Sequence, residues 1–233
     1  LLKSWEKLLS PDENSIEEQL KLVVLNPSRE HVKGDDGHYI DMAAEDAKQL
    51  AKFLKNRLAD LYQHFELLMT FPEQKQSWIF AKHLVLEADN TVEIVYATLD
   101  YLRNHNIIHT QFLAGLLSGL NVKEPAEWKE IIELIGSDEK LIQYYPEAIR
   151  TGRFETSHLD VFIRLIAEKK LPSYSASTLV YGRATEHLTE EEISRFCMSL
   201  SEIDATANWV ALDNINMYTH GRNDVDFTQL RET

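Results

Sequence analysis

Apolar positions at helical spacing dominate the second half of the chain. One run places four apolar residues at i, i+3, i+4 and i+7, the spacing of a single buried helix face: Leu159, Phe162, Ile163 and Ile166. The same pattern returns 34 residues later, at Ile193, Phe196, Cys197 and Leu200. Each run precedes a second, partly apolar segment, Ala176–Tyr181 and Trp209–Met217. The pattern predicts two helix–turn–helix units.

The pairing of helices extends back to about residue 91. Apolar landmarks of the first helix in each pair are spaced by 36, 31 and 34 residues: Val92, Trp128, Leu159 and Ile193. Second helices are expected over Phe112–Leu120 and near 138–150. Such offsets are typical of helical-hairpin repeats, where each unit buries its apolar face only against its neighbours. We therefore predict an all-α fold with antiparallel helical hairpins stacked as an α-solenoid over residues 73–233.

Residues 1–72 form a separate predicted segment. A helix is expected over 16–26, with Asn14 or Ser15 as its N-cap and Asn26-Pro27 at its end. Residues 27–41 lack helical periodicity, and the glycines on either side of Asp35-Asp36 predict a turn. Asp41 is expected to cap a long spine helix near 42–69, in which the apolar positions keep helical spacing throughout.

A Gly-Arg pair follows the second helix of three successive hairpins, at Gly152-Arg153, Gly182-Arg183 and Gly221-Arg222. Glycine at such a junction can take the left-handed helix-cap conformation. The arginine is then placed to bond carbonyls or a carboxylate of the adjoining hairpin. A structural junction is the preferred interpretation, and an arginine ladder that binds a ligand is the alternative.

The charge and composition of the chain argue against nucleic acid and membranes as partners. The formal net charge is −14, with 38 Asp and Glu against 24 Lys and Arg, so the chain repels phosphate at long range. Nucleic acid is therefore an unlikely partner, and the only dense basic stretch is Lys48–Arg57. The single cysteine, Cys197, fits a reducing, cytoplasmic compartment and a buried position. No apolar run has the ~18 residues of a membrane helix.

One cluster of candidate metal ligands lies in the loop before the spine helix. Asp35, Asp36, His38 and Asp41 place four possible ligands within seven residues, as sites for hard cations require. The bidentate glutamate that ends an EF-hand loop is missing, and a solvated turn with a helix cap explains the same residues. The sequence shows no glycine-rich phosphate loop, nucleophile elbow or Cys/His metal framework, so we expect neither an enzyme nor a cofactor.

Residues 91–222 resemble the HEAT-like α-solenoids, a class of helical-hairpin repeat used as protein-binding scaffolds. The Gly-Arg junctions also resemble helical scaffold regions of large bacterial multidomain ATPases. The resemblance implies a non-catalytic interaction module whose partner is another protein or another domain of a larger parent chain. The chain starts at Leu1 and stops soon after Gly221, so the repeat domain is expected to be truncated. A metal-dependent enzyme or metal-stabilised domain using Asp35, Asp36 and His38 is the alternative, and a HEAT-like nucleic-acid-binding protein is the third.

Overall fold

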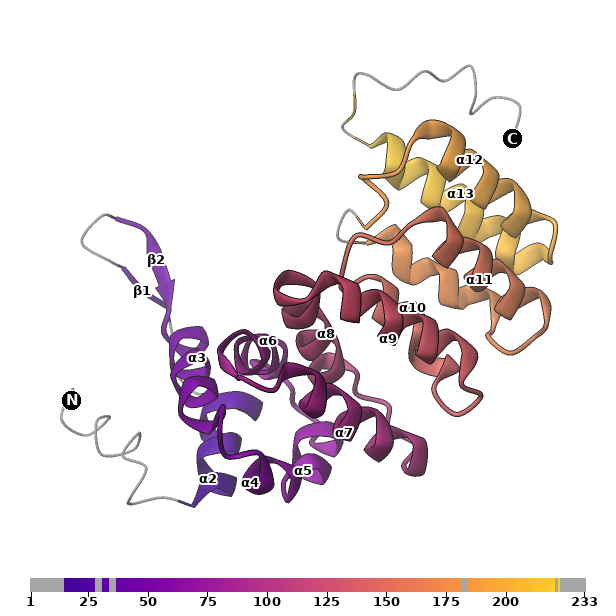
Figure 1. Cartoon of the computed structure of the whole chain (residues 1–233). Helices are drawn as coiled ribbons and strands as arrows, with labels where there is room; N and C mark the ends of the chain where they lie inside the picture. Colours follow the sequence, from indigo (N-terminus) through magenta and orange to yellow (C-terminus); the bar gives the residue numbers. More distant parts are fainter. Residues whose placement is uncertain (1–14, 28–30, 34–36, 182–183, 221, 223–233) are drawn as a thin grey trace. The chain divides into compact units, whose positions relative to one another are not determined.

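The computed structural model describes residues 15–27, 31–33, 37–181, 184–220 and 222 (Figure 1). The described chain is mostly helical and includes one two-stranded sheet, so the prediction of an all-α fold is confirmed at this level. Its contacts form two compact units, residues 1–129 and 130–233, and helix α9 runs across the division. Each unit is described by itself below. The predicted boundary at residues 72 and 73 falls inside the first unit.

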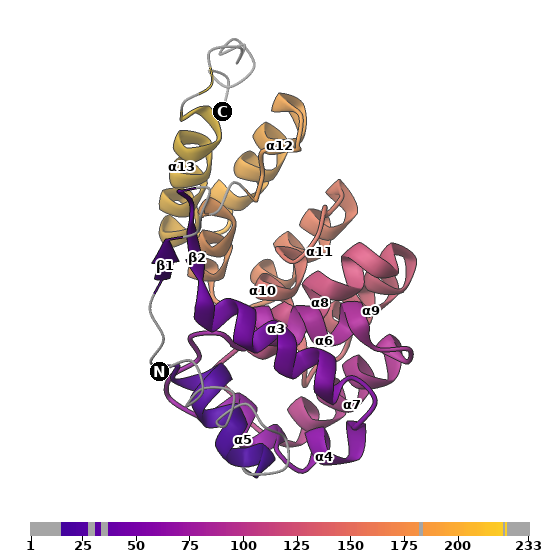
Figure 2. The same ribbon diagram turned by 90° about the vertical axis from the view of Figure 1, so that its left-hand side faces the viewer.

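The first unit contains short helices, a hairpin and three longer helices that pack together. Helix α3 packs on α6, and α6 packs on α8 (Figure 2). The elements are α2 (Ile16–Gln19), the π-helix η1 (Leu20–Leu25), β1 (His31–Lys33), β2 (Tyr39–Asp41), α3 (Met42–Leu54), α4 (Leu58–Tyr62), α5 (Phe65–Thr70), α6 (Ser77–Glu87), α7 (Thr91–Asn104), α8 (Gln111–Lys123) and the first residues of α9 (Pro125–Ser137).

The predicted spine helix over residues 42–69 is wrong, because the chain turns twice within it. Helix α3 ends at Leu54, α4 covers Leu58–Tyr62, and α5 begins at Phe65. A straight helix of that length would be about 42 Å long and would carry its apolar stripe past the end of its neighbours. The two turns instead keep Leu54, Leu61 and Phe65 inside the core, with exposed fractions of 0%, 0% and 4%. Tertiary packing therefore overrides a continuous helical pattern.

Residues 27–41, predicted to form only a turn, contain an antiparallel hairpin. Val32 pairs with Ile40 between β1 and β2, and Gly37 lies in the connection with a φ of +84°, a conformation that favours glycine. At the end of the hairpin, the Asp41 carboxylate accepts hydrogen bonds from the amides of Ala43 and Ala44. The structure thus places Asp41 as the N-cap of α3.

The helix predicted over residues 16–26 is present as α2 followed by η1. Ser15 is its N-cap and accepts a hydrogen bond from the amide of Glu18. The last part, η1, has π-helical bonds, as from the amide of Asn26 to the carbonyl of Lys21. Val24 is buried on the side that carries Leu20, and Leu22 is 52% exposed.

The second unit is built from helices that follow one another as hairpins. The segment predicted as one helix near 138–150 consists of η2 and a short α10, and the segment Ala176–Tyr181 belongs to a 3₁₀ helix, η3. Helix α12 packs on α13, and α13 packs on η3 (Figure 1). The elements are η2 (Ile142–Tyr144), α10 (Tyr145–Ile149), α11 (Thr156–Ala167), η3 (Ser173–Val180), α12 (Glu190–Ser201) and α13 (Ala205–Thr219).

The apolar faces predicted for these hairpins are largely confirmed. Every predicted position on α12 is buried, namely Ile193, Phe196, Cys197 and Leu200. On α11, Leu159, Phe162 and Ile166 are buried, whereas Ile163 is only half-buried. The central stripe of each helix therefore follows from its 3.6-residue period.

Candidate protein-binding surface

Helix α13 presents large apolar side chains to solvent. Trp209 is 71% exposed, Leu212 51% and Met217 41%. The opposite side of the helix is buried and carries Ala207, Val210, Ala211, Asn214 and Tyr218. An exposed tryptophan beside other large apolar groups is typical of protein-interaction surfaces. We take this side of α13 as the candidate site and refer to it as the α13 face, defined by Trp209, Leu212, Asp213, Asn216 and Met217.

Polar bonds fix the orientation of α13. The Asp204 carboxylate accepts a hydrogen bond of 2.8 Å from the amide of Ala207 and another from the hydroxyl of Ser173, 31 residues earlier. The Asn214 side-chain amide donates to the carbonyl of Ala176 in η3 at 3.5 Å. The Tyr218 hydroxyl donates to the carbonyl of Leu188 at 2.9 Å. Because both ends of the helix are fixed, the α13 face cannot turn inward without breaking these bonds.

Acidic residues surround the α13 face in sequence. Between Glu190 and Thr219 there is a single basic side chain, Arg195, and it forms an ion pair of 3.1 Å with Asp160 of α11. Hydrogen bonds from the Ser173 hydroxyl and the Ala207 amide hold the pKa of Asp204 below its usual range. The carboxylates of this stretch are Glu190, Glu191, Glu192, Glu202, Asp204 and Asp213. This stretch therefore carries an excess of negative charge, while Lys169 acts on Asp204 at one end of α13 and Arg222 lies over Tyr218 at the other.

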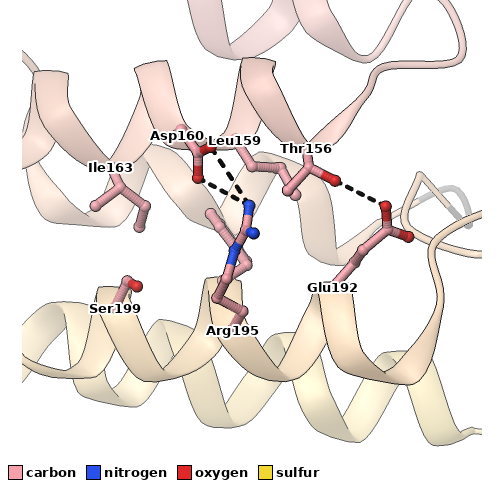
Figure 3. A pocket seen from close by; sticks show the side chains of 8 residues that line it. Thr156, Leu159, Asp160, Ile163, Glu192, Arg195 and Ser199 are labelled. Carbon is pink, nitrogen blue, oxygen red and sulfur yellow. Dashed lines mark hydrogen bonds and ion pairs between the residues drawn. The ribbon is translucent and has the colours of Figure 1, made fainter.

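A small pocket of about 100 Å³ lies between α11 and α12 (Figure 3). The Thr156 hydroxyl donates a hydrogen bond of 2.7 Å to Glu192, and Arg195 reaches both carboxylate oxygens of Asp160 at 3.1 and 3.3 Å. Bonds from the Thr189 amide, the Thr156 hydroxyl and the Thr189 hydroxyl keep the pKa of Glu192 low. These polar groups bind one another across the pocket, so their clear role is to position α12 on α11.

A bond of the same kind joins two helices of the first unit. Thr91, the first residue of α7, donates its hydroxyl hydrogen bond to Glu124, the residue before α9. Thr156 is likewise the first residue of α11, and Glu192 lies in the first turn of α12. The two bonds span 33 and 36 residues. Each bond therefore joins the first residue of one helix to a glutamate at the start of a later helix.

The Gly-Arg junctions are partly visible. Arg222 places its guanidinium 4.3 Å from the centre of the Tyr218 ring and donates to the carbonyl of Glu186 at 3.4 Å, a bond of the kind expected at a structural junction. Gly152 is half-buried, and Arg153 is exposed. Gly182, Arg183 and Gly221 lie outside the described residues. The structure therefore does not gather the three arginines into a described ligand site.

The predicted metal loop is also only partly visible. Asp35 and Asp36 lie outside the described residues, His38 is exposed, and Asp41 uses its carboxylate to cap α3. Where the chain is described, no group of three or more His, Cys, Asp or Glu residues is arranged to hold a metal ion.

The basic stretch Lys48–Arg57 is largely neutralised by nearby acids. Lys48 contacts Glu45 at 2.6 Å, and Arg57 contacts Asp60 at 2.7 Å. Lys55 lies 4.0 Å from Glu87 of α6. A phosphate backbone would have to compete with these carboxylates for the same cations.

Sequence reasoning identified Trp209–Met217 as a partly apolar helix but missed that its apolar groups point outward. A signal was present in the sequence. Ala207, Ala211 and Tyr218 form one helical stripe, and Trp209 with Leu212 forms a second stripe on the other side. A helix with two apolar stripes needs two partners, and the hairpin covers only the stripe that contains Tyr218.

No family model, no curated protein and no solved structure matches this chain. Among the described residues, no helix combines the length and the hydropathy needed to cross a bilayer.

Proposed function

We propose that this chain is a non-catalytic protein-interaction or scaffolding module, built from antiparallel helical hairpins that stack as an α-solenoid. The observation that carries the proposal is the α13 face, where a rigidly held helix exposes Trp209 and Leu212 to solvent. Burying such groups against a partner is the usual way in which a helical scaffold gains affinity.

The repeated polar contacts support the solenoid arrangement. Hydrogen bonds link residues 30 to 38 positions apart, as in Tyr218 to Leu188 and Asn214 to Ala176. In a solenoid, each hairpin contacts its neighbours at one repeat length, so bonds of this separation are expected to recur. The fully buried Cys197 agrees with a reducing compartment, and we place the module in the cytoplasm.

Capture followed by reconstitution tests the proposal. An affinity-tagged chain would be expressed in its native source, cross-linked, and recovered with its neighbours. Each recovered protein would then be purified and titrated against the purified chain by calorimetry. We expect at least one direct partner with a Kd of about 1 µM or tighter and a negative heat-capacity change, as buried apolar surface gives. If every recovered protein failed to bind directly at 100 µM, the interaction function would be rejected.

A further inference from the structure

We propose that the α13 face docks a basic, amphipathic helix of a partner protein. This inference rests on the proposed function and specifies the partner's chemistry. It depends on two separate properties of the α13 face, namely its exposed apolar side chains and the negative charge around them.

The spacing on α13 suits a helical partner. Leu212 and Asn216 stand three and seven residues after Trp209, and Asp213 and Met217 stand four and eight residues after it. Trp209 therefore lies between two rows of side chains, one with Leu212 and Asn216 and the other with Asp213 and Met217, along the exposed side of the helix. The 15 residues of α13 give a length of about 22 Å, which matches four turns of a second helix packed alongside.

The negative charge of the α13 face favours a partner with positive charge. Asp213 lies within the α13 face, one turn from Trp209, and Glu202 and Asp204 immediately precede the helix. Arg195 is paired with Asp160, whereas the positive charge of Lys169 acts on Asp204, so the negative charge offered to a partner comes chiefly from Asp213 and Glu202. Lysines or arginines that flank an apolar stripe on the partner would meet them as opposite charges, which raises the association rate and selects against acidic partners.

The same charge argues against a second copy of this chain as the occupant. In a two-fold dimer through α13, the same patch of each copy meets the other, so two surfaces of the same negative charge would come together. Like charges brought together in this way oppose association. A basic helix from a different protein satisfies both the apolar and the charged part of the surface.

A peptide titration tests the assignment. The probe is a fluorescein-labelled 18-residue peptide of lysine and leucine, with leucines at i, i+3, i+4 and i+7, and the matched probe has glutamate at every lysine. Anisotropy would be recorded with the full chain in 50 and 300 mM NaCl. We expect the lysine peptide to bind, with affinity that falls as salt rises, and the glutamate peptide to bind at least tenfold more weakly.

Two variants of the α13 face, each with a matched control elsewhere, separate this face from the rest of the chain. Trp209→Ala should weaken binding of the lysine peptide about 30-fold, the loss typical of a central tryptophan. Its control is Ile108→Ala, since Ile108 is 85% exposed but lies between α7 and α8. Asp213→Lys should weaken binding at low salt more than Glu139→Lys, which makes the same change in net charge before η2.

Each contrary result overturns the assignment. The assignment would be wrong if Trp209→Ala and Ile108→Ala bound the lysine peptide with equal affinity. It would also be wrong if Asp213→Lys and Glu139→Lys weakened binding at low salt to the same extent. A Trp209-dependent dimer in sedimentation equilibrium would identify a second copy as the occupant. If the partner found by capture bound the Trp209→Ala chain with unchanged affinity, the interaction function would stand and the docking site would lie elsewhere.

Discussion

The close packing of α6 against α8 makes Gly115 a sensitive position in the first unit. A Cβ atom at residue 115 would lie 2.4 Å from the carbonyl oxygen of Trp78 and 2.8 Å from the Cβ of Ala81. Gly119, one turn later, is similarly close to the carbonyl oxygen of Lys82, at 2.6 Å. The two glycines therefore let the helix backbones approach at a distance that any side chain would prevent.

The expected cost of Gly115→Ala follows from two opposing terms. Alanine is a better helix former than glycine by about 1 kcal/mol, which favours the variant. The new methyl group, however, needs about 1 Å of extra separation from backbone atoms that cannot rotate away. Such a gap removes a quarter to a half of the dispersion energy at each affected contact, and overpacking costs about 1–3 kcal/mol or more. We therefore expect a net loss of about 2 kcal/mol in the free energy of unfolding.

Urea unfolding followed by circular dichroism measures this change. The matched control is Val122→Ala on the same helix, because Val122 is 61% exposed and its replacement alters helix propensity without affecting the α6–α8 contact. The control should stay within about 0.5 kcal/mol of the parent chain. If Gly115→Ala were as stable as the parent or more stable, the close approach of α6 and α8 would be wrong.

Three further predictions concern the second unit. Lys169 has a φ of +59°, a conformation that glycine adopts more easily than lysine. Lys169→Gly should therefore raise the free energy of unfolding, measured in urea, by about 0.5–1 kcal/mol. A decrease would contradict that backbone conformation. Glu192 has a folded pKa below its usual value, so its stabilising effect is complete above the unfolded pKa of about 4.3 and is lost as the pH falls through the lower folded pKa. Glu192→Gln should therefore lower the melting temperature at pH 7 and have less effect at pH 3, and an equal effect at both would refute the linkage. Burial raises the pKa of Cys197 to about 12, so the thiol is protonated and inaccessible in the folded chain. Iodoacetamide at pH 8, with mass spectrometry as the readout, should therefore alkylate it only after unfolding. Rapid labelling of the native chain would disprove its burial.

Helix faces with a single apolar stripe could be predicted from the sequence. On α8, all five expected residues are buried, namely Phe112, Leu113, Leu116, Leu117 and Leu120. The period of 3.6 residues is a local property of the chain, so it needs no knowledge of the partner helix. The same local chemistry predicted a cap at Asn14 or Ser15, where the structure has Ser15, and a cap at Asp41, which is confirmed.

Features that depend on tertiary packing could not be predicted in this way. The turns on either side of α4 interrupt a continuous helical pattern because burial of Leu61 and Phe65 outweighs the lost helix bonds. The outward position of Trp209 depends on which of two apolar stripes packs against α12 and η3. In α8 the sequence does contain a clue, because Gly115 and Gly119 stand one turn apart, and small residues at that spacing allow close helix contact.

The most direct measurement of the central claim is the calorimetric titration of the purified chain with each purified protein that it captures in its native source. We expect direct binding with a Kd of about 1 µM or tighter and a negative heat-capacity change from buried apolar surface. Absence of heat at 100 µM with every captured protein would contradict the claim that this chain is an interaction module.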